Sequence, residues 1–333
     1  MKDTRVMVEL AKIKDSLSGQ SLQGRKVLVA GGTGLIGTSM TQTLLHLESH
    51  VRSTYFSNTP TTHPEIYEQR DFTSFTDCME ATKGVQDLII CAAQIFGAQM
   101  MKENPTGALL PNLQINAGLI EAAARNQVER VIFISSSTVY QEANYPIAES
   151  DLDLNQKPFK LYQGVGTLNR YIESLIQFYH DTNRFKAGIV RPTAVYGPND
   201  QFADGKSHII PANIKRALGN EDPYVVWGDG TPVRDFVYVG DVVESVLHVL
   251  TRHCHAEAIN VGSGSPITIA EAVKTILEVC KSNPTITYDP SKPSSLPFRA
   301  VSTQRHDELF PEITRTSFHH GIEKTVQWYQ ASL

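Results

Sequence analysis

Short apolar segments alternate with longer amphipathic segments along the first 192 residues. The apolar segments predict strands over residues 26–30, 50–56, 87–93, 130–135 and 186–192. Three segments between them carry apolar residues at helical spacing, over residues 39–47, 113–126 and 167–179. Strands that alternate with helices are typical of a parallel sheet with crossover helices. The pattern therefore predicts an α/β fold, a Rossmann-type doubly wound parallel sheet.

The rhythm changes after Pro192, where Pro and Gly become frequent and shorter segments interleave with helices. We expect a smaller mixed α/β C-terminal domain that binds substrate. The predicted organisation is an N-terminal helical extension over residues 1–24, a dinucleotide-binding domain over 25–192 with parts of 233–262, and a substrate domain over 193–232 and 263–333. The extension has charges every few residues, which favours an amphipathic helix lying on the main domain over a signal peptide or membrane span.

Composition narrows the partners. The 333 residues are 41% hydrophobic and 20% charged, which suits one large or two intimately joined domains. The net charge is -5 and the basic residues are scattered, so we expect a small-molecule partner rather than nucleic acid or a membrane. Four cysteines lie far apart without CxxC spacing, which favours a cytoplasmic location. The histidine groups at 253–255 and 319–320 lack zinc-site spacing, so no metal is expected.

The segment KVLVAGGTGLIGTSM places three glycines between a predicted strand and a predicted helix. Gly31 permits a tight turn, Gly34 lets a pyrophosphate approach the backbone, and Gly37 allows the helix to pack on the sheet. Because strand and helix flank the glycines correctly, a dinucleotide site is favoured over a plain turn. The predicted cofactor site includes the other residues of this turn, Thr33, Leu35 and Ile36.

The end of the second predicted strand bears on the choice of dinucleotide. An NAD site usually has an acidic residue about 20 residues after the glycines, and residues 50–64 contain none. Arg52 and Ser57 suit the 2′-phosphate of NADP(H), which we favour; alternatively, Arg52 is an exposed strand residue and the cofactor is NAD(H). Asp71 follows a possible third strand, where it either accepts from the adenine amino group or caps the next helix.

The glycine turn, FISSSTVY (133–140), LYQGVG (161–166) and VRPTAVYGPND (190–200) resemble the extended short-chain dehydrogenase/reductase family of nucleotide-sugar epimerases, dehydratases and reductases. The second half is most similar to the GDP-fucose synthase subfamily, 3,5-epimerase/4-reductases of GDP-4-keto-6-deoxymannose. The stretches that carry this likeness are SHIIPANIKRA (207–217), VVWGDGTPVRDFVYVGDV (225–242), NVGSG (260–264) and DPSKP (289–293).

The resemblance implies a proton relay. Ser136 matches the serine that holds the substrate oxygen, and Tyr162 matches the tyrosine that transfers a proton. Without the resemblance, Ser136 reads as a hydroxyl in a strand-end turn and Tyr162 as an aromatic residue at a helix start. Gly166 occupies the position of the lysine that supports the tyrosine. Lys160 is the nearest cation in the sequence, and it can serve only if the chain before Tyr162 is extended.

The resemblance also implies residues for epimerisation and binding. His208 matches one acid/base of the epimerases, but Thr138 stands where their cysteine should be, and a hydroxyl is a poor base compared with a thiol. His208 therefore acts as a single acid/base or binds substrate. The implied substrate-binding residues are Asn199, His208, Arg216, Trp227, Arg234 and Lys292. The cofactor-binding residues implied beyond the glycine turn are Ala92, Ala93, Tyr162 and Pro192.

The sequence thus predicts an NAD(P)-dependent reductase, with or without epimerase activity, of a GDP-linked 4-keto-6-deoxyhexose. The alternatives are another epimerase or dehydratase with a tightly bound, recycled cofactor, and a catalytically idle nucleotide-sugar binding protein. The resemblance further implies a homodimer formed through the two long helices over residues 113–126 and 167–179.

Overall fold

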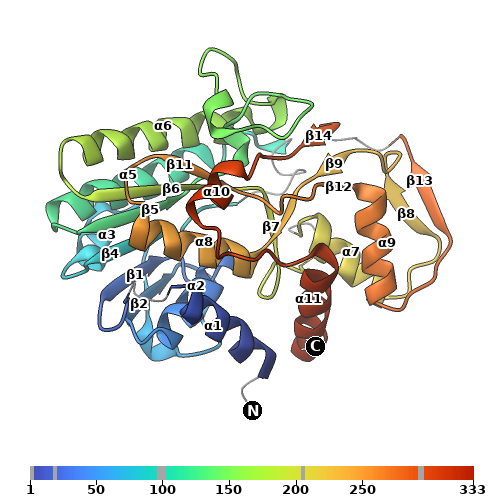
Figure 1. Ribbon diagram of the computed structural model, residues 1–333, viewed down its shortest axis with the longest axis horizontal. Helices are drawn as coiled ribbons and strands as arrows, with labels where there is room; N and C mark the ends of the chain where they lie inside the picture. The colour runs from blue at the N-terminus through green and yellow to red at the C-terminus, as the bar shows by residue number, and fades with distance from the viewer. Residues whose placement is uncertain (1–3, 18–20, 96–102, 204–206, 292–295) are drawn as a thin grey trace.

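The computed structural model describes residues 4–17, 21–95, 103–203, 207–291 and 296–333. Figure 1 shows a large lobe in which helices cover both faces of a sheet, and a smaller lobe that carries α7, α9 and α11. The chain ends in the smaller lobe. None of the helices in the described residues is long and apolar enough to cross a membrane.

Seven parallel strands form the sheet of the large lobe, in the order β11-β6-β5-β4-β1-β2-β3. The strands are β1 (Lys26–Ala30), β2 (His50–Tyr55), β3 (Tyr67–Gln69), β4 (Asp87–Ile90), β5 (Arg130–Ile134), β6 (Lys186–Pro192) and β11 (Ala258–Val261). The order reverses between β1 and β4, which is the switch point where doubly wound sheets bind ligands. The predicted fold class is confirmed.

Helices cover both faces of this sheet (Figure 1). One face carries α3 (Phe75–Thr82), α5 (Leu109–Arg125) and α6 (Gln163–Asp181); the other carries α1 (Thr4–Ser16), α2 (Leu35–His46) and α8 (Val239–Arg252). In β1, Val27 and Val29 pack toward α2 and α8, whereas Leu28 and Ala30 pack toward α3 and α5. Alternate side chains of a strand point to opposite faces, so a strand covered on both sides is a continuous apolar run.

The N-terminal segment forms the amphipathic helix that its charge pattern predicts. Ile13 and Leu17 are buried in the same core as α2 and α8. On the polar side, Lys12 Nζ donates to Glu244 Oε2 of α8 at 3.2 Å and to the Thr314 carbonyl at 2.7 Å. The helix α1 therefore lies on the large lobe and covers α8.

The remaining strands form small sheets that complete the fold after residue 192. Their pairings are β10 with β7, β13 with β8, and β12-β9-β14. The strands are β7 (Ala194–Tyr196), β8 (Tyr224–Trp227), β9 (Val233–Arg234), β10 (Phe236–Tyr238), β12 (Ile267–Thr268), β13 (Ile286–Asp289) and β14 (Phe298–Arg299). The helices are α7 (Ile209–Leu218), α9 (Ile269–Val279), α10 (Gln304–Leu309) and α11 (Phe318–Ser332).

Candidate active site

The glycine turn lies at the switch point of the sheet. Gly31 follows β1 with φ of +85°, and a Cβ at this residue would lie 2.6 Å from Cα of Ala92, which follows β4. The backbone N–H of Gly32 donates to the Thr54 carbonyl at 2.7 Å, which fixes the turn against β2. A Cβ at Gly37 would lie 2.1 Å from the Gly31 carbonyl oxygen. Chain geometry therefore requires glycine at 31 and 37.

The helix that follows this turn is open to an anion. Gly34 is the N-cap of α2 and provides no side-chain cap, and the first turn contains no acidic residue. A Cβ at Gly34 would meet only the Gly31 carbonyl oxygen, at 3.7 Å, so the backbone here is not covered by packing. Helix N-termini bind phosphates through their N–H groups and dipole. These residues fit a dinucleotide pyrophosphate; Thr33 precedes the cap, and Leu35 and Ile36 begin α2.

Arg52 and Ser57 lie at different levels of the sheet. Arg52 pairs in register with Leu28, two residues before the end of β1. Its guanidinium contacts both Glu68 carboxylate oxygens of β3 at 3.3 Å and donates to the Lys83 carbonyl at 3.1 Å. Arg52, which we expected to bind a 2′-phosphate, is thus paired with Glu68. Ser57 lies beyond the end of β2 and is exposed, at the carboxyl edge of the sheet.

The other predicted cofactor residues also follow strand ends. Asp71 lies two residues after β3, and its Oδ1 accepts from the N–H and hydroxyl of Thr73. The N-cap of α3 is Ser74, so the alternative in which Asp71 caps that helix is wrong. Strand β4 ends at Ile90 rather than 93, and Ala92 and Ala93 therefore lie in the segment beyond it. Pro192 is the last residue of β6 and is buried.

The serine-rich turn and the tyrosine come from neighbouring elements. Ser136 is the N-cap of the 3-10 helix η2 (Ser137–Val139), and its hydroxyl accepts from the Thr138 N–H at 3.2 Å. Tyr162 precedes α6 as its N-cap residue. A cavity of about 30 Å³ is lined by Ser137, Thr138 and Tyr162, among others. The fold thus brings Tyr162 beside the turn that follows Ser136, although Ser136 is not among the residues that line this small cavity.

Gly166 allows α6 to lie close against η2. A Cβ at Gly166 would lie 2.3 Å from the Thr138 carbonyl oxygen and 2.8 Å from Cβ of Pro158. The backbone of η2 and the ring of Pro158 thus occupy the space in which a longer side chain would begin. Lys160 does not replace the lysine, because it belongs to the 3-10 helix η4 (Lys160–Tyr162), is exposed, and does not meet the condition of an extended chain.

Two arginines from the smaller sheets face Tyr162. The guanidinium carbon of Arg299, in β14, lies 4.7 Å from the centroid of the Tyr162 ring. Arg299 is paired in register with Arg234 of β9. Burial lowers the pKa of Arg234 to about 10, and the negatively charged form of Tyr162 acts in the opposite direction. Sequence reasoning missed Arg299, because β14 has two residues and no local pattern marks it.

The two residues expected to act in epimerisation differ in their surroundings. His208 Nδ1 lies 3.6 Å from Asp200 Oδ1, and hydrogen bonding to this buried carboxylate raises the pKa of the imidazole. His208 is half-exposed and begins α7 as its N-cap residue, so it can present a proton to a ligand. Thr138 Oγ1 is buried and has no hydrogen-bond partner among the described residues.

The predicted substrate residues are only partly brought together. Arg216 donates two hydrogen bonds to Glu221, of 2.7 and 2.6 Å, and its guanidinium lies over the Tyr224 ring. Trp227 ends β8 and is 64% exposed. Asn199 adopts a left-handed backbone with φ of 69° in the turn after β7. Arg234 is the predicted residue that faces Tyr162, and Lys292 lies outside the described residues.

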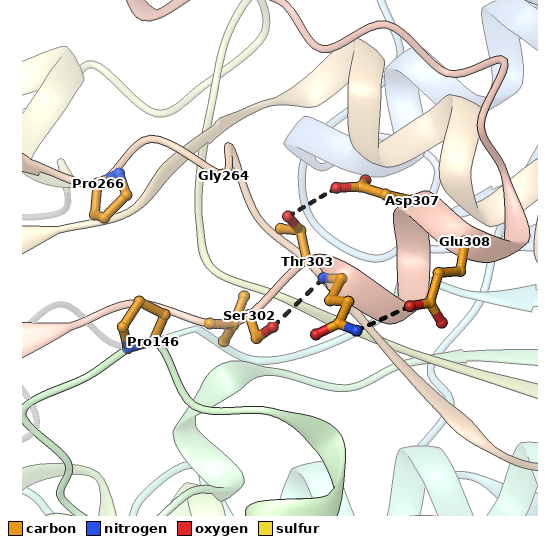
Figure 2. Close-up of a pocket in the computed structure, with 9 residues that line it drawn as sticks. Pro146, Gly264, Pro266, Ser302, Thr303, Asp307 and Glu308 are labelled. Carbon is orange, nitrogen blue, oxygen red and sulfur yellow. Dashed lines mark hydrogen bonds between the residues drawn. The ribbon is translucent and has the colours of Figure 1, made fainter.

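A larger open pocket of about 570 Å³ lies elsewhere, and Figure 2 shows its lining. Thr303 donates to Asp307, Gln304 donates to Glu308, and the Gln304 N–H donates to Ser302. These polar groups thus hydrogen-bond to one another. The lining also includes Gly264, the last residue of NVGSG, and Val301, which lines the smaller cavity as well. We place the candidate active site at the smaller cavity because Tyr162 and Thr138 line it.

The fold and the glycine turn define a Rossmann-type α/β protein. The family model described as the NAD dependent epimerase/dehydratase family matches residues 27–262, and the chain belongs to that family. Probable GDP-L-fucose synthase 1 of Oryza sativa subsp. japonica is 29% identical over 315 residues, 92% of each chain. A Streptomyces dTDP-4-dehydro-6-deoxy-D-allose reductase is 26% identical and covers 92% of this chain and 97% of its own.

A solved structure supports the same fold. The GDP-L-fucose synthetase of Naegleria fowleri, bound to NADP, has a TM-score of 0.79 at 21% identity and covers 93% of this chain and 95% of its own. The family resemblance found in the sequence motifs is thus confirmed, and the family is one of NAD-dependent enzymes.

Proposed function

We propose that this protein reduces a GDP-linked 4-keto-6-deoxyhexose and prefers NADPH as reductant. The observation that carries the proposal is the placement of Tyr162 at a small cavity together with the η2 turn and Arg299. The similarity to GDP-L-fucose synthases over most of the chain supports the GDP-linked substrate. The absence of an acidic residue from residues 50–64 supports NADPH. A cytoplasmic location is part of the proposal.

In this proposal, a bound nicotinamide would supply the hydride with its two electrons, and side chains of the protein would supply the proton. Ser136 holds the keto oxygen, and the Tyr162 hydroxyl donates its proton to that oxygen as it gains charge. Ala92, Ala93 and Pro192 border the cofactor, together with the glycine turn. Arg234 suits the substrate diphosphate, because a guanidinium pairs two phosphate oxygens at once.

Reduction is favoured over a combined epimerase/reductase activity. Two-base epimerisation needs a second proton carrier, and Thr138 offers only a buried hydroxyl. His208 retains a carboxylate partner, Asp200, and serves in this proposal as a single acid/base or as a substrate ligand. The similarity to a reductase of a dTDP-linked 4-keto sugar is consistent with a reductase that does not epimerise.

The test is a substrate screen. Purified protein is incubated with GDP-, UDP-, dTDP- and CDP-linked 4-keto sugars and either NADPH or NADH. Absorbance at 340 nm follows the oxidation of the cofactor, and NMR identifies the products. We expect NADPH-dependent reduction of the GDP-linked sugar, with Tyr162→Phe slower by at least about 100-fold. Reduction by Tyr162→Phe at the wild-type rate would contradict the assigned role.

The cofactor released on denaturation tests the alternative of a recycled, tightly bound cofactor. We expect none in stoichiometric amount, because a reductase exchanges its cofactor at each turnover. Stoichiometric NAD(P) released from the purified protein, together with interconversion of sugars without added reductant, would instead identify an epimerase or dehydratase. Binding of nucleotide sugars without any turnover would identify a binding protein.

A further inference from the structure

The contact between Tyr162 and Arg299 joins two distant parts of the chain. Tyr162 belongs to the segment that begins α6, whereas Arg299 belongs to β14, which reaches the site by pairing with β9. The guanidinium carbon of Arg299 lies 4.7 Å from the tyrosine ring centroid. Its Nη2 donates to Ser137 Oγ at 2.9 Å. Arg299 is therefore held between the tyrosine and the serine-rich turn.

Arg299 lies among other charged and ionisable groups. Arg234 and Arg299 are register partners on adjacent strands, and like charges in that arrangement repel. Both side chains are half-buried. Burial lowers the pKa of Arg299, whereas the charged form of Tyr162, a hydrogen bond to it, and Asp235 act in the opposite direction. Asp235, the other acid near Arg299, is 1% exposed, and burial raises its own pKa.

The missing lysine gives this contact a function. The protein has glycine at position 166, and Thr138 and Pro158 fill the space beside it. Lys160 is exposed on the surface of η4. In the part of the chain that the structure describes, the groups against Tyr162 include Arg299 from β14, Arg234 from β9 and the Phe159 ring at 5.9 Å.

We propose that Arg299 is a positioning residue that supplies the positive charge for Tyr162 in place of the absent lysine. The inference rests on the proposed role of Tyr162 in reduction. In the reduction, the carbonyl carbon would take hydride from a bound nicotinamide and the keto oxygen would take the proton of Tyr162, so that the alcohol, the oxidised cofactor and a phenolate result. The negative charge then lies on the tyrosine whose ring the Arg299 guanidinium faces. In the reverse direction, the same charge stabilises the phenolate that accepts the proton of the sugar hydroxyl.

The first test follows Tyr162 without any substrate. The protein is labelled with tyrosine carrying ¹³C at Cζ, and the Tyr162 signal is assigned by its loss in Tyr162→Phe. The ionisation of this signal is then titrated in wild type, Arg299→Gln and Arg299→Lys. We expect Arg299→Gln, which keeps a donor for Ser137 but has no charge, to move the midpoint alkaline by about one unit or more. Arg299→Lys should restore most of the shift.

Controls separate charge from packing. Lys160→Met removes the neighbouring exposed cation and should leave the titration unchanged. If Arg299→Gln does not fold, Arg299→His serves, because imidazole is neutral well above pH 6.5 and should give the same alkaline shift. Superimposable titrations of wild type and the neutral variant would overturn the inference, and so would a shift in Arg299→Lys equal to that in Arg299→Gln.

The second test uses the reaction. The rate of alcohol oxidation should begin to rise at a pH about one unit higher in Arg299→Gln than in wild type, while NADPH binding stays unchanged. The two tests keep the claims apart. If the Tyr162 titration depends on the charge at position 299 but the protein has no reductase activity, only the proposed function is overturned. If the protein is an active reductase and the Tyr162 titration does not change in Arg299→Gln, only this inference is overturned.

Discussion

The choice between NADPH and NADH depends on single side chains near the end of β2. Because Arg52 is engaged by Glu68 inside the sheet, Arg52→Ala should leave the ratio of NADPH to NADH affinity within about twofold. Ser57→Glu introduces an acid at the carboxyl edge and should shift the ratio toward NADH by about tenfold, the effect of one charge-assisted hydrogen bond of roughly 1.4 kcal/mol.

Fluorescence titration of both cofactors against the three proteins measures these ratios. Thermal melts of Arg52→Ala report separately on the loss of its ion pair with Glu68. A large change of cofactor preference in Arg52→Ala would show that the arginine leaves Glu68 to bind a phosphate.

Residue patterns predicted the glycine turn but not the whole surroundings of Tyr162. The glycines were predictable because backbone geometry restricts their positions to glycine, as the close approaches at Gly31 and Gly37 show. The absence of a lysine at Gly166 was also visible. The substitute cation was not, because Arg299 lies 137 positions further along the sequence and reaches Tyr162 only through strand pairing.

At the scale of elements, the start of α6 tolerates side chains unequally. A Cβ at Gly166 meets backbone and a proline ring, which cannot yield as a flexible side chain can. Gly166→Ala should therefore destabilise the protein by about 1–3 kcal/mol through overpacking, and Gly166→Lys should destabilise it further without restoring a relay. Gly164→Ala is the matched control, because its Cβ meets the Leu109 side chain at 3.1 Å.

Urea unfolding of the three variants measures these differences, and we expect Gly164→Ala to stay within about 1 kcal/mol of wild type. Wild-type stability of Gly166→Lys would contradict the close packing of α6 on η2. That result would also show that a lysine side chain fits beside Tyr162.

Two buried histidines, His248 of α8 and His306 of α10, should make the protein less stable in acid. His248 of α8 lies against Ser16, Arg252 and Glu312, and His306 lies against Ser245, Asp307 and Arg315. Burial lowers the pKa of each imidazole to about 4. Both histidines are neutral in the folded protein at pH values where they are charged in the unfolded chain.

Because the unfolded chain binds more protons between pH 6.5 and 4, acidification through this window should lower the free energy of unfolding, by on the order of 3 kcal/mol for each histidine. Asp241 and Asp235 act oppositely, since burial raises the pKa of both, to about 6 for Asp241, so the contribution of each imidazole is measured by comparing its variant with wild type. Urea unfolding at several pH values measures the slope. His248→Gln and His306→Gln should each flatten it, and an unchanged slope in both variants would contradict the burial argument.

The elements of the large lobe were predictable, and the reason is visible in the core. Buried parallel strands are rich in apolar residues, so β1, β2, β4, β5 and β6 each begin at the predicted residue, although β4 ends at Ile90 rather than 93. The two-residue strands β9, β12 and β14 carry no periodicity of their own and form only because their partners position them. Of the site residues on these strands, Arg234 was named from the family resemblance, whereas Arg299 was missed. The predicted domain boundaries stay a prediction.

At the scale of the whole molecule, the outer faces of α5 and α6 predict a dimer. Ile172 and Ile176 of α6 are buried against the large lobe, whereas Tyr171 and Phe178 on the other side of the helix are 55% and 64% exposed. Leu110 of α5 is 62% exposed. Figure 1 shows the two helices side by side on one face of the molecule, and they pack against each other. Helices with an apolar stripe on each side bury the second stripe against a partner.

We therefore expect a homodimer in which α5 and α6 pack against the same helices of a second copy, since a two-fold axis lets one surface serve both subunits. The mass of one chain is 36.9 kDa, and light scattering at micromolar concentration should give twice that mass. Phe178→Glu and Tyr171→Glu should give the monomer mass, because each brings a charge into the apolar interface. Leu154→Glu is the matched control: Leu154 is 65% exposed but lies outside both helices, and its variant should remain dimeric. A monomeric wild type, or dissociation by Leu154→Glu and not by Phe178→Glu, would contradict this interface.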